Sequence, residues 1–588
     1  MKKLVSLFVL ALVFATNLRA DDILHYVPKD VDVFLHWRSG KVVGDTFKES
    51  NLGRISKHSD YQKSIKAIVG TIKDMATDDD GFSGFTWMFP FLNELENIGE
   101  GEFVFFLRSL EEEEYERSPV LIQIGIICKG GDGMKGMRRY LKDFAAQSTT
   151  NIRVTEEDDV YGVLFGGDPK SVLRWESEET CVLSNPLHQE IYASDEVQVM
   201  IAGFVNTMGL MNAMFDVGFI DRDDAISMKE MGLWGLRAII FSEGFNDGRW
   251  DSNGVFITVE DREAMLQILD GHKEINQEML KVVPVDAIYV NTWQLNLKDY
   301  FPKMVSLLSH LDKPMVAEFT LGMAYISSAL KINMMTDVVA QIQNGYVTYC
   351  DRVKGYDLGY GMCIVSQLDD PESANKTAYK ILQNLSSFEI TPKQWENEDG
   401  LFCEIDETFI GISYGHLVIA YDRGVLDRAV AQLKSPSTSI LDNEKFIESR
   451  TYFGDSNGTS LIFSDLEASA PEFAAYYQKT DRAASKIRLP YRRVARYLDY
   501  MGATVWIDEN SLGWSMVSPF PFAYFYSPIS LDDIGFVGID SVYGIFEAGF
   551  DAGNATGKRL EREQKARREA EKAAGSVPDS NQATEPVE

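Results

Sequence analysis

The sequence predicts an α+β protein of two tandem repeats, each an antiparallel sheet with helices packed on one face. The first supporting observation is that VPKDVDVFLHW at 27–37 returns as VPVDAIYVNTW at 283–293. The Pro-x-Asp start and the closing tryptophan both recur at an offset of 256 residues (283 − 27). Proline fixes φ and the aspartate can bond back onto a turn, so each stretch predicts a turn that leads into a strand.

The second observation is a repeated hairpin. A glycine precedes an aromatic-rich strand at 98–107 and again at 342–351, and aligning Gly101 with Gly345 gives an offset of 244 residues (345 − 101). A second apolar run follows each strand, so both places predict a hairpin. A turn and a helix follow in each case, with acidic residues and a proline before the second helix as start signals.

The third observation closes each unit. Met231-Gly232 and Met501-Gly502 each open a strand, a polar Gly/Asn turn and another strand, at an offset of 270 residues (501 − 231). Between these anchors, 395–433 predicts three strands and a helix, with Tyr414-Gly415 as one of the turns. Its counterpart near 158–175 is degenerate, so we expect the duplication to have drifted most there.

These patterns divide the chain into five parts. We predict a signal peptide at 1–20, repeat unit 1 at 21–275 and repeat unit 2 at 276–527. A glycine-rich apolar segment at 528–557 and a charged helix with a disordered tail at 558–588 complete the chain.

Composition excludes several functions. The chain has 588 residues, 45% of them hydrophobic, which is enough for a large core. It carries 57 Lys and Arg against 89 Asp and Glu, a net charge of −32. Such a charge repels phosphates and anionic lipids, so we expect no nucleic-acid partner and no adsorption to acidic membranes.

The N-terminus predicts export. Lys2 and Lys3 precede the apolar run at 4–15, and Ala20 precedes an acidic start, which is the layout of a secretory signal peptide. An uncleaved anchor is the alternative. No later run is long and apolar enough to span a bilayer. We therefore expect a periplasmic or secreted protein.

The cysteines predict no metal centre. The five are widely spaced, and neither a C-x-x-C pair nor a His/Cys cluster with zinc spacing is present. A disulfide between Cys350 and Cys363, across a predicted hairpin, is an alternative to free thiols in an oxidising compartment.

One stretch of the sequence matches the motif of serine hydrolases. The residues at 411–415 match the G-x-S-x-G pattern, with Ser413 as the nucleophile and His416 directly after it. That chemistry needs a sharp turn from a strand into a helix, whereas HLVIAY, which follows, predicts a strand. We therefore assign no catalytic, cofactor-binding or metal-binding residue, and we expect no cofactor.

The opening Pro-x-Asp strand and the unit ISYGHLVIAYDRGVLDRAVAQL at 412–433 resemble a family of uncharacterised exported bacterial proteins of planctomycete and cyanobacterial type. The resemblance implies an exported location and the fold of a domain of unknown function. It implies no site residue.

The expected function is that of a non-enzymatic envelope protein that binds a protein, a polymer or a small ligand, because a tandem architecture places a groove between its halves. One alternative is a serine hydrolase that uses Ser413. Another is a carrier that holds an apolar ligand between sheet and helices.

Overall fold

A computed structural model describes residues between 21 and 520 of this chain. The longest gaps in that description are 58–100, 110–121, 167–178, 352–360 and 471–496, with shorter gaps between other elements. Within it, 18 strands form one sheet, and every strand pair is antiparallel. The α+β class with an antiparallel sheet is confirmed.

The first half of the sheet is centred on β1 (Val33–Trp37). β2 and β6 flank β1, and the order outward is β2-β3-β5-β4 on one side and β6-β7-β8 on the other. The strands of this half are β2 (Glu102–Ser109), β3 (Ile122–Lys129), β4 (Ile152–Glu157), β5 (Val160–Phe165), β6 (Gln198–Asn206), β7 (Leu236–Asn246) and β8 (Arg249–Thr258).

The second half is centred on β9 (Tyr289–Trp293). β10 and β16 flank β9, and the order outward is β10-β11-β15-β14-β13-β12 on one side and β16-β17-β18 on the other. The strands of this half are β10 (Tyr346–Cys350), β11 (Met362–Gln367), β12 (Lys393–Asn397), β13 (Gly400–Ile405), β14 (Thr408–Ser413), β15 (His416–Ala420), β16 (Ser460–Asp465), β17 (Tyr500–Ile507) and β18 (Ser511–Ser518).

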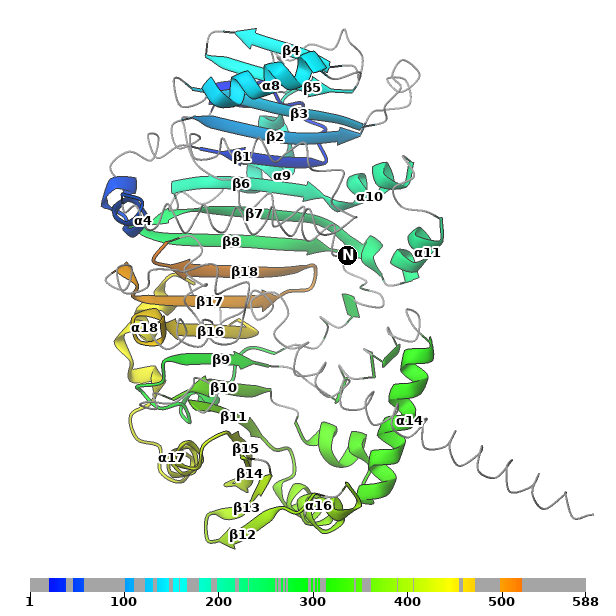
Figure 1. Ribbon diagram of the computed structural model, residues 1–588, viewed down its shortest axis with the longest axis vertical. Coiled ribbons are helices and arrows are strands. Elements are labelled where there is room, and N and C mark those ends of the chain that lie inside the picture. Colours follow the sequence, from blue (N-terminus) through cyan, green and yellow to red (C-terminus); the bar gives the residue numbers. More distant parts are fainter. Residues whose placement is uncertain are drawn as a thin grey trace, which may run out of the picture.

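The halves meet where β8 pairs with β18, near the middle of the ladder in Figure 1. Side chains reinforce this junction. Arg249, at the start of β8, donates to Asp499 at 2.6 Å, and its guanidinium lies 3.8 Å from the ring centre of Tyr500. Charge pairing and cation–π contact therefore link the halves beside the backbone ladder.

Both faces of the sheet are buried. Successive side chains of a strand point to opposite faces, and in β1 Phe34 joins one hydrophobic cluster while Leu35 joins another. The Leu35 cluster contains residues from both halves, including Trp293 and Met501. One face therefore has a core common to both halves, and the other carries a separate cluster in each half.

The described helices pack on both faces, which corrects the expectation of helices on one face. α9 and α17 supply Ile191 and Leu426 to the separate clusters, whereas α4 supplies Leu52 and Ile55 to the shared core. β1 and β9 require this because every residue of these strands is buried, on both faces of the sheet. The helices are α2 (Asp21–Leu24), α4 (Asn51–Ile55), α8 (Lys135–Gln147), α9 (Pro186–Ile191), α10 (Thr207–Asp216), α11 (Arg222–Glu230), α12 (Gln277–Leu280), α14 (Lys313–Leu330), α16 (Pro371–Asn384), α17 (Arg423–Lys434), α18 (Glu444–Thr451), the π-helix η7 (Met334–Val338) and the 3₁₀ turns η4 (Val182–Ser184), η5 (Leu233–Gly235), η8 (Val339–Gln341), η9 (Leu385–Phe388) and η10 (Ile440–Asp442).

Two of the predicted alignments shift. Trp37 pairs with Phe103 and Trp293 pairs with Tyr346, so matching the two tryptophans sets Phe103 against Tyr346, an offset of 243 residues (346 − 103) and not 244. Gly345 has a positive φ of 74°, and a Cβ there would lie 2.0 Å from the carbonyl oxygen of Trp293. The local backbone therefore requires glycine at this position. Glycine was therefore a poor anchor for the alignment.

The third anchor is also wrong in detail. Gly232 adopts a left-handed conformation ahead of β7, whereas Met501 and Gly502 lie inside β17. Both regions are nevertheless strand–turn–strand hairpins, as predicted.

The disulfide between Cys350 and Cys363 is not formed. Cys363 lies opposite Tyr349, and Cys350 lies opposite Met362. Cys350 belongs to the shared core and Cys363 to the cluster on the other face, so the two sulfurs lie on opposite sides of the sheet. All five cysteines are buried free thiols.

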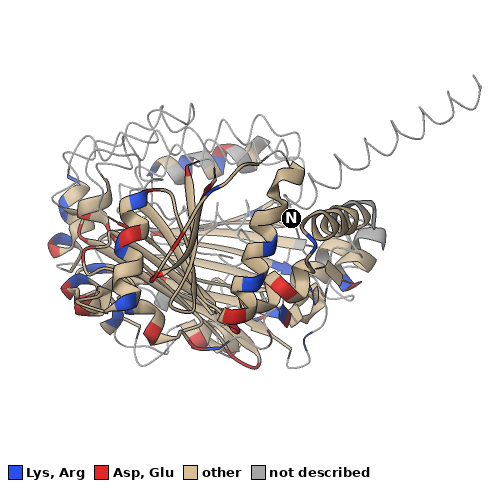
Figure 2. Ribbon diagram, turned by 90° about the horizontal axis from the view of Figure 1, so that it is seen from below, with Lys and Arg blue, Asp and Glu red and all other residues tan. Residues whose placement is uncertain are grey.

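Charged residues lie mostly on the peripheral helices and loops, and the strands through the middle of Figure 2 are largely without them. No helix in the described part of the chain is both long and apolar enough to cross a membrane. The predicted signal peptide at 1–20 and the tail segments at 528–557 and 558–588 lie outside the described residues.

Candidate functional site

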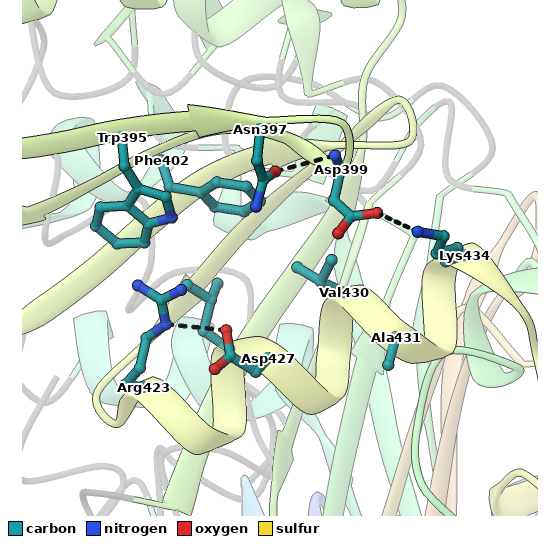
Figure 3. A pocket seen from close by; sticks show the side chains of 10 residues that line it. Trp395, Asn397, Asp399, Phe402, Arg423, Asp427, Val430, Ala431 and Lys434 are labelled. Atoms are coloured by element: carbon teal, nitrogen blue, oxygen red, sulfur yellow. Dashed lines mark hydrogen bonds and ion pairs between the residues drawn. The ribbon is translucent and has the colours of Figure 1, made fainter.

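A cavity of about 250 Å³ lies between the β12–β13 hairpin and α17. Figure 3 shows the hairpin side chains facing the helix and the helix side chains pointing back toward the hairpin. The lining residues are Trp395, Asn397, Asp399, Phe402, Arg423, Leu426, Asp427, Val430, Ala431 and Lys434. We call this site the cradle.

The hairpin is fixed by its turn. The Asn397 side-chain oxygen accepts the backbone N–H groups of Asp399 and Gly400, at 2.9 and 3.2 Å. Such a bond from an asparagine to the backbone two residues on favours a tight turn. Gly400 has a φ of 151°, and a Cβ there would lie 2.1 Å from the Ile412 carbonyl oxygen, so the turn requires glycine.

The helix is fixed by its cap and its apolar face. Asp422 accepts the N–H groups of Gly424 and Val425, which is the N-cap arrangement. Val425 and Ala429 are buried against the sheet. Arg423, Asp427 and Lys434 follow one another at helical spacing, so they lie along the face toward the hairpin.

One end of the cradle combines aromatic rings with a cation. Trp395 and Phe402 lie opposite each other on β12 and β13, with ring centres 5.6 Å apart and planes 15° apart. The Arg423 guanidinium carbon lies 4.2 Å from the Trp395 ring centre, and Arg423 Nε donates to Asp427 Oδ1 at 2.9 Å. The stack and the ion pair together hold the guanidinium in place.

The other end is a small ionic network. Lys434 Nζ donates to Asp399 Oδ1 at 2.7 Å and to Glu398 at 3.2 Å, and the Tyr414 hydroxyl also donates to Asp399 Oδ1. Hydrogen bonds from Lys434 and then Tyr414 lower the pKa of Asp399, and the bond to Asp399 raises the pKa of Lys434. Both groups therefore stay charged at neutral pH.

These charges favour binding over catalysis. A general acid or base works best with a pKa near the operating pH, and the Asp399 pKa is moved the other way. A glycosidase-type acid would likewise need a raised carboxyl pKa. No group of three or more metal-ligating side chains occurs in the described part of the chain. The cradle can orient a ligand, and the shifted pKa values of Asp399 and Lys434 suit these two groups poorly to proton transfer.

Ser413 lies close to the cradle but outside it. It ends β14, is 1% exposed, and its hydroxyl donates to the Asp399 carbonyl at 2.8 Å. Tyr414 and Gly415 have φ values of 47° and 78°, which make the two-residue turn into β15. His416 Nδ1 lies 2.9 Å from the Tyr414 carbonyl oxygen. The predicted hairpin is confirmed, and the turn into a helix that a serine nucleophile requires is absent here.

A second polar pair lies within the sheet. His36 Nε2 is 2.8 Å from Glu102 Oε1, and both side chains are fully buried on β1 and β2. Burial lowers the pKa of His36 well below its usual value, and Arg38 and His188 lower it further. Both side chains have 0% exposure, so we interpret the contact as a structural pair.

Comparison with known proteins gives no assignment. No family model, no curated protein and no solved structure matches this chain. The resemblance to uncharacterised exported bacterial proteins therefore stays a prediction.

Sequence reasoning missed the cradle because its halves come from separate elements. Trp395 and Arg423 are 28 residues apart (423 − 395), and neither belongs to a recognised binding or catalytic motif. The available signal was a single large aromatic among the polar residues KQWEN at 393–397. Such an aromatic on an edge strand needs a partner that covers it.

Proposed function

We propose that this chain is an exported, non-enzymatic binding protein whose ligand site is the cradle. The observation that carries the proposal is that the cradle depends on a hairpin added to one half of an otherwise matched sheet. Four of the lining residues belong to that hairpin. The finer fold prediction, a tandem duplication, is part of the same proposal.

Strand order supports the duplication. Outward from the junction, the first half reads β8-β7-β6-β1-β2-β3-β5-β4, and the second reads β18-β17-β16-β9-β10-β11-β15-β14. The cross-strand registers give the equivalent pairs Phe34 with Val290, Phe204 with Phe463, Ile240 with Gly502, and Val255 with Val517.

Those pairs locate a symmetry axis. β8 and β18 correspond at 262 residues (517 − 255), and this offset makes Asn253 equivalent to Ser515 (515 − 262 = 253). Asn253 and Ser515 lie directly opposite each other across the junction. A residue paired with its own equivalent marks a pseudo-twofold axis, so the repeats would join as the protomers of an isologous dimer do.

Connecting segments repeat as well. Asn185 donates to the Lys29 carbonyl at 2.7 Å, and Asn443 donates to the Val285 carbonyl at 2.8 Å. Isolated bridges join Pro28 to Cys181 and Pro284 to Ser439. The prolines of the recurring Pro-x-Asp stretch are therefore held in the same way in both halves.

The added hairpin breaks this correspondence. In the second half, β12 and β13 lie between α16 and β14. In the first half, α8 ends at Gln147 and β4 begins at Ile152, which leaves no length of chain for two strands. A scaffold built twice with one elaborated copy supports a function in the elaboration, since binding residues gather on segments that a rigid frame positions.

Export rests on the sequence at 1–20, whose charged start, apolar run and small residue at 20 are typical of a signal peptide. The resemblance to exported bacterial proteins points the same way. The alternatives have less support: Ser413 is buried at a hairpin turn, and four charged side chains in the cradle suit an apolar ligand poorly.

Native mass spectrometry of the full mature chain, purified gently from its own host, tests the proposal. We expect a discrete added mass that is lost in Trp395→Ala and retained in Gln394→Ala. Gln394 lies on the same strand as Trp395 but points to the other face, which makes it a matched control. An added mass that survives Trp395→Ala would refute the cradle as the site.

A further inference from the structure

We propose that the cradle takes a neutral polyhydroxylated ligand, a single saccharide ring or the end of a glycan chain. This inference rests on the proposed function, because it names the ligand class for the same site. Size, charge balance, hydrogen-bonding capacity and lining each restrict the class.

The size of the cradle favours a small ligand, because its volume is about 250 Å³. Pockets for drug-sized molecules run from about 300 to 1,000 Å³. The cradle therefore suits something close to one sugar ring, and a longer chain would extend outside it.

Charge balance disfavours ligands with a net charge. The lining holds two cations and two carboxylates, and they pair as Arg423 with Asp427 and Lys434 with Asp399. Glu398 adds a further acidic group beside Lys434. An anionic ligand would lie next to the carboxylates of Asp399 and Asp427. A cationic ligand would meet the same carboxylates already paired with Lys434 and Arg423, so neither ligand gains an unpaired counterion. A phosphorylated or strongly acidic ligand is the least suitable.

Each end of the cradle keeps a donor next to an acceptor. Arg423 uses Nε for Asp427 Oδ1, and among the described residues no group bonds its two Nη atoms or Asp427 Oδ2. At the other end, Asn397 uses its oxygen within the turn and Asp399 uses Oδ1 for Lys434. The Asn397 amide nitrogen and Asp399 Oδ2 have no hydrogen-bond partner in the described part of the chain.

A hydroxyl group fits such neighbouring sites. It donates one hydrogen bond and accepts others at one oxygen, so a single hydroxyl can bond an Arg423 Nη and Asp427 Oδ2 together. A second hydroxyl can do the same with Asn397 and Asp399. An aliphatic chain would leave these groups desolvated and unpaired.

The remaining lining suits the carbon skeleton of a sugar. Leu426 and Val430 present aliphatic surface from α17, and Phe402 presents a ring from β13. Trp395 stands above Arg423, so the guanidinium packs against one face of the indole. A pyranose combines C–H groups with equatorial hydroxyls, which matches an apolar floor between two polar ends.

Saturation-transfer NMR on the full mature chain tests the ligand class. The probes are neutral monosaccharides and disaccharides (glucose, galactose, mannose, N-acetylglucosamine and their dimers), glucuronic acid, glucose 6-phosphate and a mixture of free amino acids. We expect saturation transfer to at least one neutral sugar and none to the acidic or phosphorylated sugars.

Variants locate the binding. Asp427→Asn keeps the shape but exchanges an acceptor for a donor, and we expect about tenfold weaker sugar binding, which is about 1.4 kcal/mol. Trp395→Ala should abolish binding, and Gln394→Ala should leave it unchanged. Thermal unfolding of each variant checks that it folds, and Arg423→Lys supplies a second conservative change with the same expected loss.

The outcomes separate this inference from the proposed function. A co-purified ligand that is not a sugar and is lost in Trp395→Ala would overturn the saccharide class and leave the cradle as the binding site. Sugar binding that Trp395→Ala and Asp427→Asn leave unchanged would overturn both assignments of the cradle. Absence of any bound sugar together with absence of any co-purified mass would overturn both as well.

Discussion

Gly254 of β8 lies directly opposite Trp514 of β18, and the indole occupies the space that a Cβ at position 254 would need. Such a Cβ would lie 2.0 Å from two atoms of the ring. The same arrangement of a cross-strand aromatic over a glycine recurs at Phe106 with Gly125, Phe241 with Gly203, Phe402 with Gly411, and Trp506 with Gly513. An aromatic ring over a glycine is one way in which a sheet pins its register.

Gly254→Ala should therefore weaken the junction between the halves. The added methyl group forces the indole away, and overpacking of this kind costs about 1–3 kcal/mol of unfolding free energy. Urea denaturation measures the change. In a Trp514→Ala background the same substitution should cost much less, because the clashing ring is gone. Equal costs in the two backgrounds would refute the contact.

The buried pair of His36 and Glu102 should make stability depend on pH. Burial holds the pKa of His36 well below its usual 6.5, so below that pH the unfolded chain binds a proton that the folded chain does not. Stability should fall on acidification from pH 6.5, by up to about 1.4 kcal/mol per pH unit. Denaturation curves at pH 7.5, 6.5 and 5.5 check the slope.

Thr292 precedes Trp293 in β9 as His36 precedes Trp37 in β1, and its hydroxyl donates to the Tyr346 carbonyl at 3.1 Å. His36→Thr alone leaves the Glu102 carboxyl without its imidazole partner and should cost about 1–3 kcal/mol. The double variant with Glu102→Gln should cost less than the two single changes together. The unfolding free energy of the double variant should also no longer fall between pH 6.5 and 5.5. If it still falls, the pH dependence comes from groups other than His36.

The thiols should be inert in the folded protein. All five cysteines are buried and free, and burial raises the pKa of Cys128 and Cys363 to about 12. Thiolate is the reactive form, so iodoacetamide at pH 8 should add no mass to the native chain and five adducts after denaturation. A reductant should leave the melting temperature unchanged. Fewer than five adducts in the denatured, unreduced chain would indicate a disulfide.

Ser413 should not react with a fluorophosphonate probe. Its hydroxyl is buried and donates to the Asp399 carbonyl, and the helix that would help to stabilise an oxyanion is missing. Ser413→Ala should cost about 1 kcal/mol of stability through the lost hydrogen bond. Labelling of the folded chain that disappears in Ser413→Ala would restore the hydrolase alternative.

Local structure could be predicted because it depends on neighbours in sequence. The unit at 395–433 has its three strands, its Tyr414-Gly415 turn and its helix where they were expected, since alternation, turn residues and caps are all local signals. The tryptophans of the recurring stretch end β1 and β9, and the prolines each form an isolated bridge ahead of these strands.

Contacts between residues that lie far apart in the sequence could not be predicted. Nothing in β8 or β18 indicates that they pair, and the aspartates of the recurring stretch differ in partner. Asp30 binds Arg108 of β2 at 2.8 Å, whereas Asp286 binds Arg428 of α17 at the same distance. The alignment of Gly101 with Gly345 failed for a related reason. Gly345 is required by its close contact with the Trp293 backbone, which exists only in the folded chain. The cradle depends on a similar meeting of a strand and a helix.

The position of β18 has a consequence for the order of assembly. β8 ends at Thr258, yet the strand that covers its edge begins at Ser511 and closes the described sheet. In a chain that emerges N-terminus first, strands β1 to β8 can form their hydrogen bonds while the outer edge of β8 waits for β18. That edge includes Trp250 and Val255, and an open apolar edge recruits foreign strands. The outer edge of β8 in a newly made chain therefore stays open to foreign strands until the β17–β18 hairpin pairs with it.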